Sequence, residues 1–266
     1  MRIYEIYDEE SNLSIGTLLY YEKDNRYIIE LQNYLDEWTA PLLFTRQVAD
    51  KEYTILYELS YIWVKERVIP SGRQNINSIL LHHKLKEYRE IDFLEISEGR
   101  CSQDSLCVKK RHDLPDYVKK RLSRNIRECL ITDDNQLLCF FMDGTTKKID
   151  VLRMSDVDCV KKIKDNEQVF KTAQVGTGGY GVLFNDALEL SSRRLYEAGD
   201  AIPISLNDFM SFVKSNILDT SESCNLLECS RQNLSYLVKE QYIHPIKDNV
   251  KGNLYLKGDI LLMDKR

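Results

Sequence analysis

The run of glycines at residues 176–181 has the G-x-G-x-x-G spacing with which many proteins bind the pyrophosphate of a dinucleotide. In such a site a strand precedes the loop and a helix begins at its last glycine, so that backbone N–H groups face the phosphates. Here the run is followed by Val182, Leu183 and Phe184, which favour a strand. We therefore predict a glycine hairpin at this position and no nucleotide cofactor.

The histidine and cysteine residues do not have the spacing of a metal site or a catalytic group. None of the seven cysteines forms a C-x-x-C pair, and no Walker loop or H-E-x-x-H motif occurs. His82 and His83 are adjacent on a predicted helix, where their side chains diverge and cannot bind one metal ion together. We expect no metal site and no enzymatic activity. An unrecognised active site in the N-terminal half stays an alternative.

Polar residues near the C-terminus have a spacing that places them on one face of a predicted helix, as in helices that contact DNA. Within the predicted helix 231–240, Leu234, Leu237 and Val238 form an apolar face. The opposite face then carries polar residues at i, i+3, i+4 and i+7, namely Gln232, Ser235, Tyr236 and Lys239. In a major groove, Gln232 would read an adenine edge, while Arg231 and Lys239 would contact phosphate or guanine. Further contacts to the DNA backbone are expected from Lys247, Lys251 and Lys257.

Several short elements position these residues. Residues 220–222 begin a first helix that ends near Glu228, and Ser230 can cap the second helix. Two predicted strands, 246–247 and 254–256, enclose residues 248–253, and a short helix follows at 260–263. This order, with the turn 229–234, the helix end 237–239, Tyr255 and Asp259, resembles the winged helix-turn-helix of excisionases and mercury-resistance regulators. The resemblance implies DNA binding. Docking of a protein is the alternative role for such a module.

The middle of the chain, residues 126–205, predicts a small α+β domain. Strands at 126–132 and 136–142 precede the turn Asp143-Gly144 and a strand at 145–152, which is a strong hairpin signal. The F-x-D-G motif at 141–144 and the later L-E-L and L-Y-E-A-G motifs at 188–190 and 195–199 resemble a family of small bacterial domains of unknown function. The chain departs from that family at Phe184, where tryptophan is usual, and at Glu189, where aspartate is usual. The resemblance implies architecture and no catalytic residue.

The first block, residues 1–118, also predicts an α+β domain. Its β-rich segments are 2–7, 14–20 and 26–31, and helical spacing follows over 52–68 and 74–88. Its many tyrosines favour core or interface positions. The G-x-L strand at 16–18 and the R-x-x-P motif at 67–70 resemble the N-terminal subdomain of HipA-type toxin kinases, whose catalytic motifs are absent here. That resemblance implies a regulator from a toxin–antitoxin or mobile-element setting.

Composition excludes several classes of protein. No apolar run is long enough to span a bilayer, and the N-terminus lacks the pattern of a signal peptide, so a cytoplasmic protein with reduced thiols is expected. The net charge of −5 gives no general affinity for nucleic acid. Residues 101–127, however, hold eight basic and three acidic side chains. This stretch is either a solvated linker or helix face, or a strip that contacts phosphate.

Together these patterns predict a multi-domain α+β protein of three modules, at residues 1–118, 126–205 and 219–266. The expected function is sequence-specific DNA binding by a bacterial transcriptional regulator, with the first two modules sensing a signal or binding a partner. Because a single recognition helix covers little DNA, we expect a homodimer held mainly by residues before about 205. The alternative is a non-enzymatic adaptor whose winged helix docks a protein.

Overall fold

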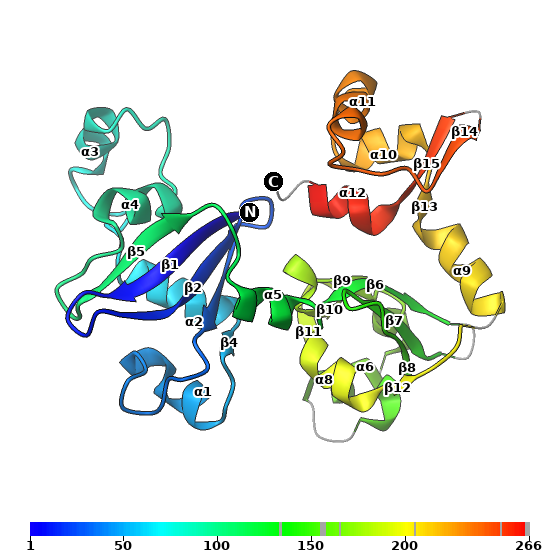
Figure 1. Ribbon diagram of the computed structural model, residues 1–266, viewed down its shortest axis with the longest axis horizontal. Coiled ribbons are helices and arrows are strands. Elements are labelled where there is room, and N and C mark those ends of the chain that lie inside the picture. Colours follow the sequence, from blue (N-terminus) through cyan, green and yellow to red (C-terminus); the bar gives the residue numbers. More distant parts are fainter. Residues whose placement is uncertain (133–134, 155–157, 165, 205, 251, 264–266) are drawn as a thin grey trace. The chain divides into compact units, whose positions relative to one another are not determined.

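The computed structural model describes residues 1–132, 135–154, 158–164, 166–204, 206–250 and 252–263 (Figure 1). The chain forms two compact units, Met1–Lys119 and Lys120–Arg266. Helix α5 (Asp116–Leu122) crosses the boundary between them. Both units contain helices and antiparallel sheets, which confirms the α+β class predicted from the sequence.

The first unit is built on a five-stranded antiparallel sheet with the order β4-β3-β2-β1-β5. Its strands are β1 (Arg2–Asp8), β2 (Leu13–Tyr21), β3 (Arg26–Leu31), β4 (Thr54–Ile55) and β5 (Leu106–Arg111). The central strands β2 and β3 are buried along almost their whole length because both faces of the sheet are covered there. The first three strands lie where the sequence predicts them.

Four helices and a short 3-10 turn accompany this sheet. They are η1 (Leu42–Phe44), α1 (Thr45–Ala49), α2 (Tyr57–Lys65), α3 (Ile76–His82) and α4 (Glu90–Ser97). Helix α2 packs on β3 through the fully buried Trp63 and Val64. The core also contains Tyr4, Tyr20 and Tyr27, which confirms core positions for part of the tyrosine-rich sequence.

The second unit contains two small sheets that share one core. The first has the order β12-β8-β7-β6 and the second the order β11-β10-β9. Their strands are β6 (Ile126–Ile131), β7 (Leu137–Phe141), β8 (Thr146–Ile149), β9 (Gln174–Val175), β10 (Gly181–Phe184), β11 (Leu188–Ser191) and β12 (Asp200–Ala201). The accompanying helices are η2 (Val151–Arg153), α6 (Asp158–Lys164), α7 (Glu167–Phe170), η3 (Thr177–Gly179) and α8 (Ser192–Ala198). The predicted hairpin of β7 and β8 around Asp143-Gly144 is confirmed.

Both faces of the β12-β8-β7-β6 sheet are covered. Cys129 pairs with Cys139 across β6 and β7, and both belong to the core shared with α8 and β10. The opposite face carries Glu128, which pairs with Phe140, and Leu130, which pairs with Leu138. On this second face the ring of Phe140 lies 4.8 Å from that of Phe212 in α9 (Leu206–Asn216). Helix α9 falls outside the elements predicted from the sequence.

The C-terminal part of the second unit has its own apolar core. It consists of β13 (Ile217–Leu218), α10 (Thr220–Leu226), α11 (Arg231–Lys239), β14 (Lys247–Val250), β15 (Gly252–Leu256) and α12 (Lys257–Met263). Strand β15 pairs with both β14 and β13, so the sheet has three strands rather than the two predicted. The core residues are Cys224, Leu234, Ile243, Tyr255 and Ile260.

Three predicted helices differ from the observed ones. The helix expected at 52–68 begins only at Tyr57, because Thr54 and Ile55 form β4 at the edge of the sheet. The helix expected at 74–88 spans only Ile76–His82 and contains no buried residue. Two residues after its end, Lys84 has a left-handed backbone, which prevents the helix from continuing. The last helix begins at Lys257 instead of Ile260. None of the described helices is long and apolar enough to cross a membrane.

Candidate nucleic-acid interface

Helices α10 and α11 are held in place by side-chain caps at both N-termini. Asp219 accepts hydrogen bonds from the backbone N–H groups of Ser221 and Glu222, and Glu222 accepts one from the N–H of Asp219. This capping box replaces the cap that the sequence placed at 220–222. Ser230 caps α11 as predicted, because its Oγ accepts the Asn233 N–H at 3.2 Å. Such caps each stabilise a helix by about 1 kcal/mol.

The outer face of α11 carries four of the residues predicted to contact DNA, and Arg231 lies at the N-terminus of the helix. Leu234 is buried and Leu237 and Val238 are half-buried, so they attach the helix to the core. The five other predicted residues are all exposed: Arg231, Gln232, Ser235, Tyr236 and Lys239. Figure 1 shows α11 beside α10, and β15 of the β14–β15 ribbon contacts α10.

Two of these residues have further structural features. The Arg231 Nη2 donates a hydrogen bond of 3.1 Å to Ser221 Oγ, which holds the guanidinium group near the N-terminus of α10. Tyr236 is 54% exposed. Tyr242 and Ile246, which follow α11 in the sequence, are also large hydrophobic residues with exposed side chains. The surface around α11 therefore offers cationic, amide and aromatic groups together.

The three lysines predicted to contact the DNA backbone lie in three different environments. Lys247 begins β14 and is exposed. Lys251 lies outside the described residues. Lys257 is half-buried at the start of α12, where its charge acts on Glu128 of β6. Lys257 thus faces β6, while the predicted contact residues of α11 are exposed to solvent.

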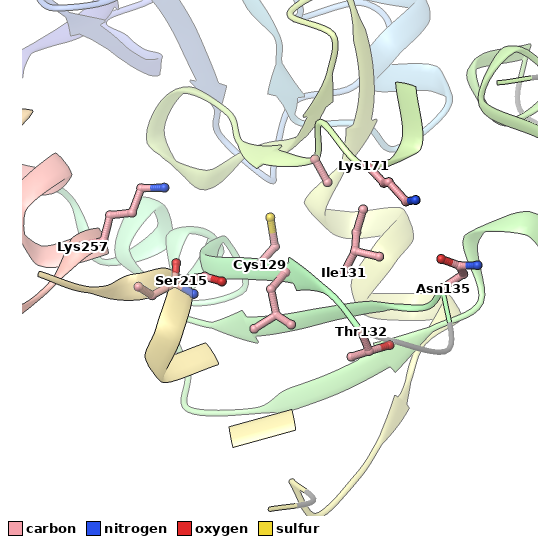
Figure 2. Close-up of a pocket in the computed structure, with 10 residues that line it drawn as sticks. Cys129, Ile131, Thr132, Asn135, Lys171, Ser215 and Lys257 are labelled. Carbon is pink, nitrogen blue, oxygen red and sulfur yellow. The ribbon is translucent and has the colours of Figure 1, made fainter. Parts of the chain in front are cut away.

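Lys257 also lines a cavity along β6 with a volume of about 630 Å³. In Figure 2, Lys257 and Ser215 lie at one end of this cavity, Lys171 and Asn135 lie toward the other, and Cys129 is between them. Burial raises the pKa of the Cys129 thiol to about 12. The thiol is therefore protonated at neutral pH and is a poor nucleophile.

The basic stretch 101–127 is distributed over both units, and many of its side chains have partners within the protein. Lys110 pairs with Glu95, Arg111 with Glu5, Lys119 with Asp116 and Arg127 with Asp259. The Lys109 Nζ lies 3.4 Å from the centre of the Tyr7 ring, and the Arg124 guanidinium lies 5.4 Å from that of Tyr196. The stretch is not a single linker or helix face, because it includes β5, α5 and the start of β6. Its role as a strip that contacts phosphate stays a prediction.

The glycine run at 176–181 joins β9 to β10, and the two strands are antiparallel, which confirms the predicted hairpin. The run packs on the start of β6: Asn125 Nδ2 donates to the Gly178 carbonyl at 3.0 Å, and Gly179 lies against Ile126 without room for a Cβ atom. The glycines thus serve a close approach of two backbones. Among the described residues, no group of three or more His, Cys, Asp or Glu side chains is placed to hold a metal ion.

Comparisons of the chain with protein-family models, with curated proteins and with solved structures gave no match. The candidate interface therefore rests on the residues and geometry of this chain.

One buried residue next to this region was not found from the sequence. Glu128 is only 4% exposed and contacts the first turn of α12. The sequence gives little signal for it, because Glu128 follows the charged Arg127 in β6 and an acidic residue in such a strand is more often on a solvated face.

Proposed function

We propose that the protein binds DNA in a sequence-specific manner, with its C-terminal segment acting as a winged helix-turn-helix. In this proposal α11 is the recognition helix and the β14–β15 ribbon is the wing. The observation that carries the proposal is the division of α11 into an apolar inner face and an outer face on which Gln232, Ser235, Tyr236 and Lys239 are exposed. Arg231 is also exposed, at the N-terminus of the helix. Capping at the N-termini of α10 and α11 keeps that outer face in a fixed orientation.

The chemistry of the exposed groups supports specific roles in DNA recognition. The Gln232 amide suits the N6 and N7 atoms of adenine in the major groove. Arg231 and Lys239, at the two ends of α11, suit phosphate oxygens or guanine. Lys247 suits the DNA backbone beside the groove, and Lys251 keeps the same expected role. Because Lys257 faces β6, we assign it to the packing of α12 and leave it out of the proposed surface.

A regulator of transcription is the form of this function that we propose, and it binds as a homodimer through residues before about 205. Two recognition helices about one turn of DNA apart would read an inverted repeat. With three to five phosphate contacts per protomer, the logarithm of affinity should fall with the logarithm of salt concentration at roughly −0.9 per phosphate neutralised.

A specific observation favours the adaptor as a second candidate. Residues 205–266 contain eight basic and eight acidic side chains, whereas DNA-binding modules are usually basic. The exposed Tyr236, Tyr242 and Ile246 are also groups that are common in protein interfaces. In this second candidate α11 docks a protein partner.

Selection from genomic DNA fragments with the purified full chain distinguishes the two candidates. We expect enrichment of an inverted-repeat motif, with an affinity that falls steeply with salt. The same selection with Gln232→Ala/Tyr236→Ala/Lys239→Ala should lose the motif, whereas Asn225→Ala, an exposed change on α10, should keep it. A monomer in light scattering at tens of micromolar, together with an affinity that salt does not change, would overturn the dimeric regulator and favour the adaptor.

A further inference from the structure

The contact between β6 and α12 is built around a buried carboxyl group. Glu128 lies on the second face of the β6–β8 sheet, in the row that contains Phe140, and this face is covered by α9 and the start of α12. Its Oε1 atom is buried and has no hydrogen-bond partner within the described part of the chain. A buried polar atom without a partner costs about 1–3 kcal/mol, and a charged one costs more. The carboxyl group of Glu128 therefore sits at an energetically sensitive position.

Gly258 brings the backbone of α12 directly onto this carboxyl group. A Cβ atom at position 258 would overlap with Glu128 Oε1 and lie 3.2 Å from the Arg127 carbonyl oxygen. A larger residue at this position would therefore displace the Glu128 carboxyl group from its present place under α12. The backbone N–H of Gly258 is close enough to the Glu128 carboxyl group to favour its ionised form.

The charged groups around Glu128 come from four elements, α12, β6, β8 and α9. Lys257 and Asp259 flank Gly258 in α12, and Asp259 forms an ion pair with Arg127 of β6. On the same face of the sheet, Lys148 of β8 lies 3.9 Å from Asp208 of α9.

Burial has the largest effect on the pKa of the Glu128 carboxyl group. Burial raises the pKa of the Glu128 carboxyl group to about 7, against the opposing effects of Lys257, the Gly258 N–H and Arg127, while Asp259 adds to the rise. The carboxyl group thus changes its charge within the ordinary range of cellular pH.

From this geometry we infer that Glu128 is a protonation-sensitive contact that controls how firmly α12, and with it the C-terminal segment, is docked on β6. The protonated carboxyl group fits the buried site, and its ionisation weakens the docking. The contact between α12 and β6 is intramolecular, so its sensitivity to protonation does not depend on whether the C-terminal segment binds DNA or a protein.

The direction of the effect follows from proton linkage. When α12 is undocked, Glu128 is solvated and titrates near its ordinary value of 4.5; when α12 is docked, it titrates at about 7. The docked form therefore binds the proton more tightly. Docking is strongest below pH 4.5, weakens as the pH rises toward 7, and changes little above that value.

Hydrogen exchange of the full chain between pH 5 and pH 8 tests the proposal. The quantity to compare is the protection factor of the α12 amides, which is corrected for the intrinsic effect of pH on exchange. In the wild type we expect this factor to fall by up to roughly tenfold per pH unit up to pH 7. Glu128→Gln keeps the shape of the side chain without its charge, so its α12 protection should not depend on pH. Glu197→Gln, an exposed change on α8, should behave as the wild type does.

A second pair of variants tests the geometry of the contact. Gly258→Ala should lower the protection of α12 at every pH, whereas Gly72→Ala, which has open space around its Cβ atom, should not. Equal pH dependence in the wild type and in Glu128→Gln would overturn the proposal. If Glu128→Gln does not fold, the carboxyl carbon of Glu128 can be titrated by NMR in the wild type, and a midpoint near the ordinary glutamate value would also overturn it.

Discussion

The backbone N–H of Cys229 donates a hydrogen bond of 3.0 Å to the carbonyl oxygen of Cys224 and thereby closes the C-terminus of α10. The Glu228 N–H donates to the carbonyl oxygen of Asn225 at 3.3 Å, and Glu228 itself has a left-handed backbone with φ of 51°. These two bonds and the left-handed residue form a Schellman motif, in which glycine is the usual residue at the position of Glu228. The turn that leads into α11 therefore contains local backbone strain.

Replacing Glu228 with glycine should stabilise this turn. Glu228→Gly removes the steric cost of the left-handed backbone, and we expect the free energy of local unfolding of α10 and α11 to rise by roughly 0.5–1 kcal/mol. Glu240→Gly is the matched control because Glu240 ends α11 with φ of −79°, so glycine brings no relief there and should destabilise. Hydrogen exchange of the α10 and α11 amides measures both effects. A loss of stability in Glu228→Gly would contradict the assignment of strain.

Two glycines with a left-handed backbone, in different hairpins, allow the cost of backbone strain to be separated from the cost of steric overlap. Gly179 and Gly144 have φ of 75° and 85°, but only Gly179 lies against another segment, the carbonyl group of Ile126. We expect Gly144→Ala to cost about 1 kcal/mol through strain alone. Gly179→Ala should cost more, because β6 and the hairpin must separate. Calorimetry of the two variants should therefore show the larger fall in thermal midpoint for Gly179→Ala, and equal falls would show that the close approach is unimportant.

Two residues on α11 should carry the sequence preference if the protein reads DNA. Gln232→Ala and Tyr236→Ala should each weaken binding to the selected motif by roughly 1–3 kcal/mol, while binding to unrelated DNA stays almost unchanged. Lys239→Ala should instead weaken both kinds of binding and lower the salt dependence by about one phosphate. Fluorescence anisotropy with motif and scrambled duplexes measures these differences. An unaltered preference in both of the first two variants would remove α11 as the recognition helix.

The first unit should lose stability in acid through Glu95. The Tyr4 hydroxyl donates a hydrogen bond of 2.6 Å to Glu95 Oε1, and Lys110 and Arg2 lie at 3.3 and 3.4 Å from the same atom. Burial raises the pKa of Glu95, but the hydrogen bonds and the positive charges together lower it by more than burial raises it. The pKa of Glu95 therefore lies below the ordinary glutamate value.

Because the unfolded chain then binds the proton more tightly, this stabilisation is present above the ordinary glutamate pKa and is lost as the pH falls. We expect the thermal midpoint of the first unit to decrease as the pH falls below the ordinary glutamate pKa of 4.5, and Glu95→Gln to show a smaller decrease. Glu37→Gln, an exposed change, should retain the wild-type slope. An identical slope in Glu95→Gln would exclude Glu95 as the group responsible.

Local patterns predicted much of the fold and of the candidate interface. Alternation and turn residues identified β1 to β3 and the β7–β8 hairpin, because these signals arise within a few neighbouring residues. The helical spacing of Leu234, Leu237 and Val238 likewise fixed which side of α11 faces solvent.

Features that depend on distant residues could not be predicted in this way. Strand β13 exists because Ile217 pairs with Leu256, and its two residues carry no pattern of their own. The burial of Glu128 and the half-burial of Lys257 depend on the close approach of Gly258. Such tertiary contacts override the local preference of charged residues for solvent.

The pairing of β1 with β5 has a consequence for the synthesis of the protein. Ile3 lies opposite Arg111, so β1 meets one of its two neighbours only after more than a hundred further residues have been made. Until β5 has been made, β1 is an open edge of the sheet with unpaired backbone groups. Strands of other chains can add to such an edge. Ribosomes that stall before Leu106 should therefore release fragments that aggregate, whereas those that pass Arg111 release a first unit with its sheet complete.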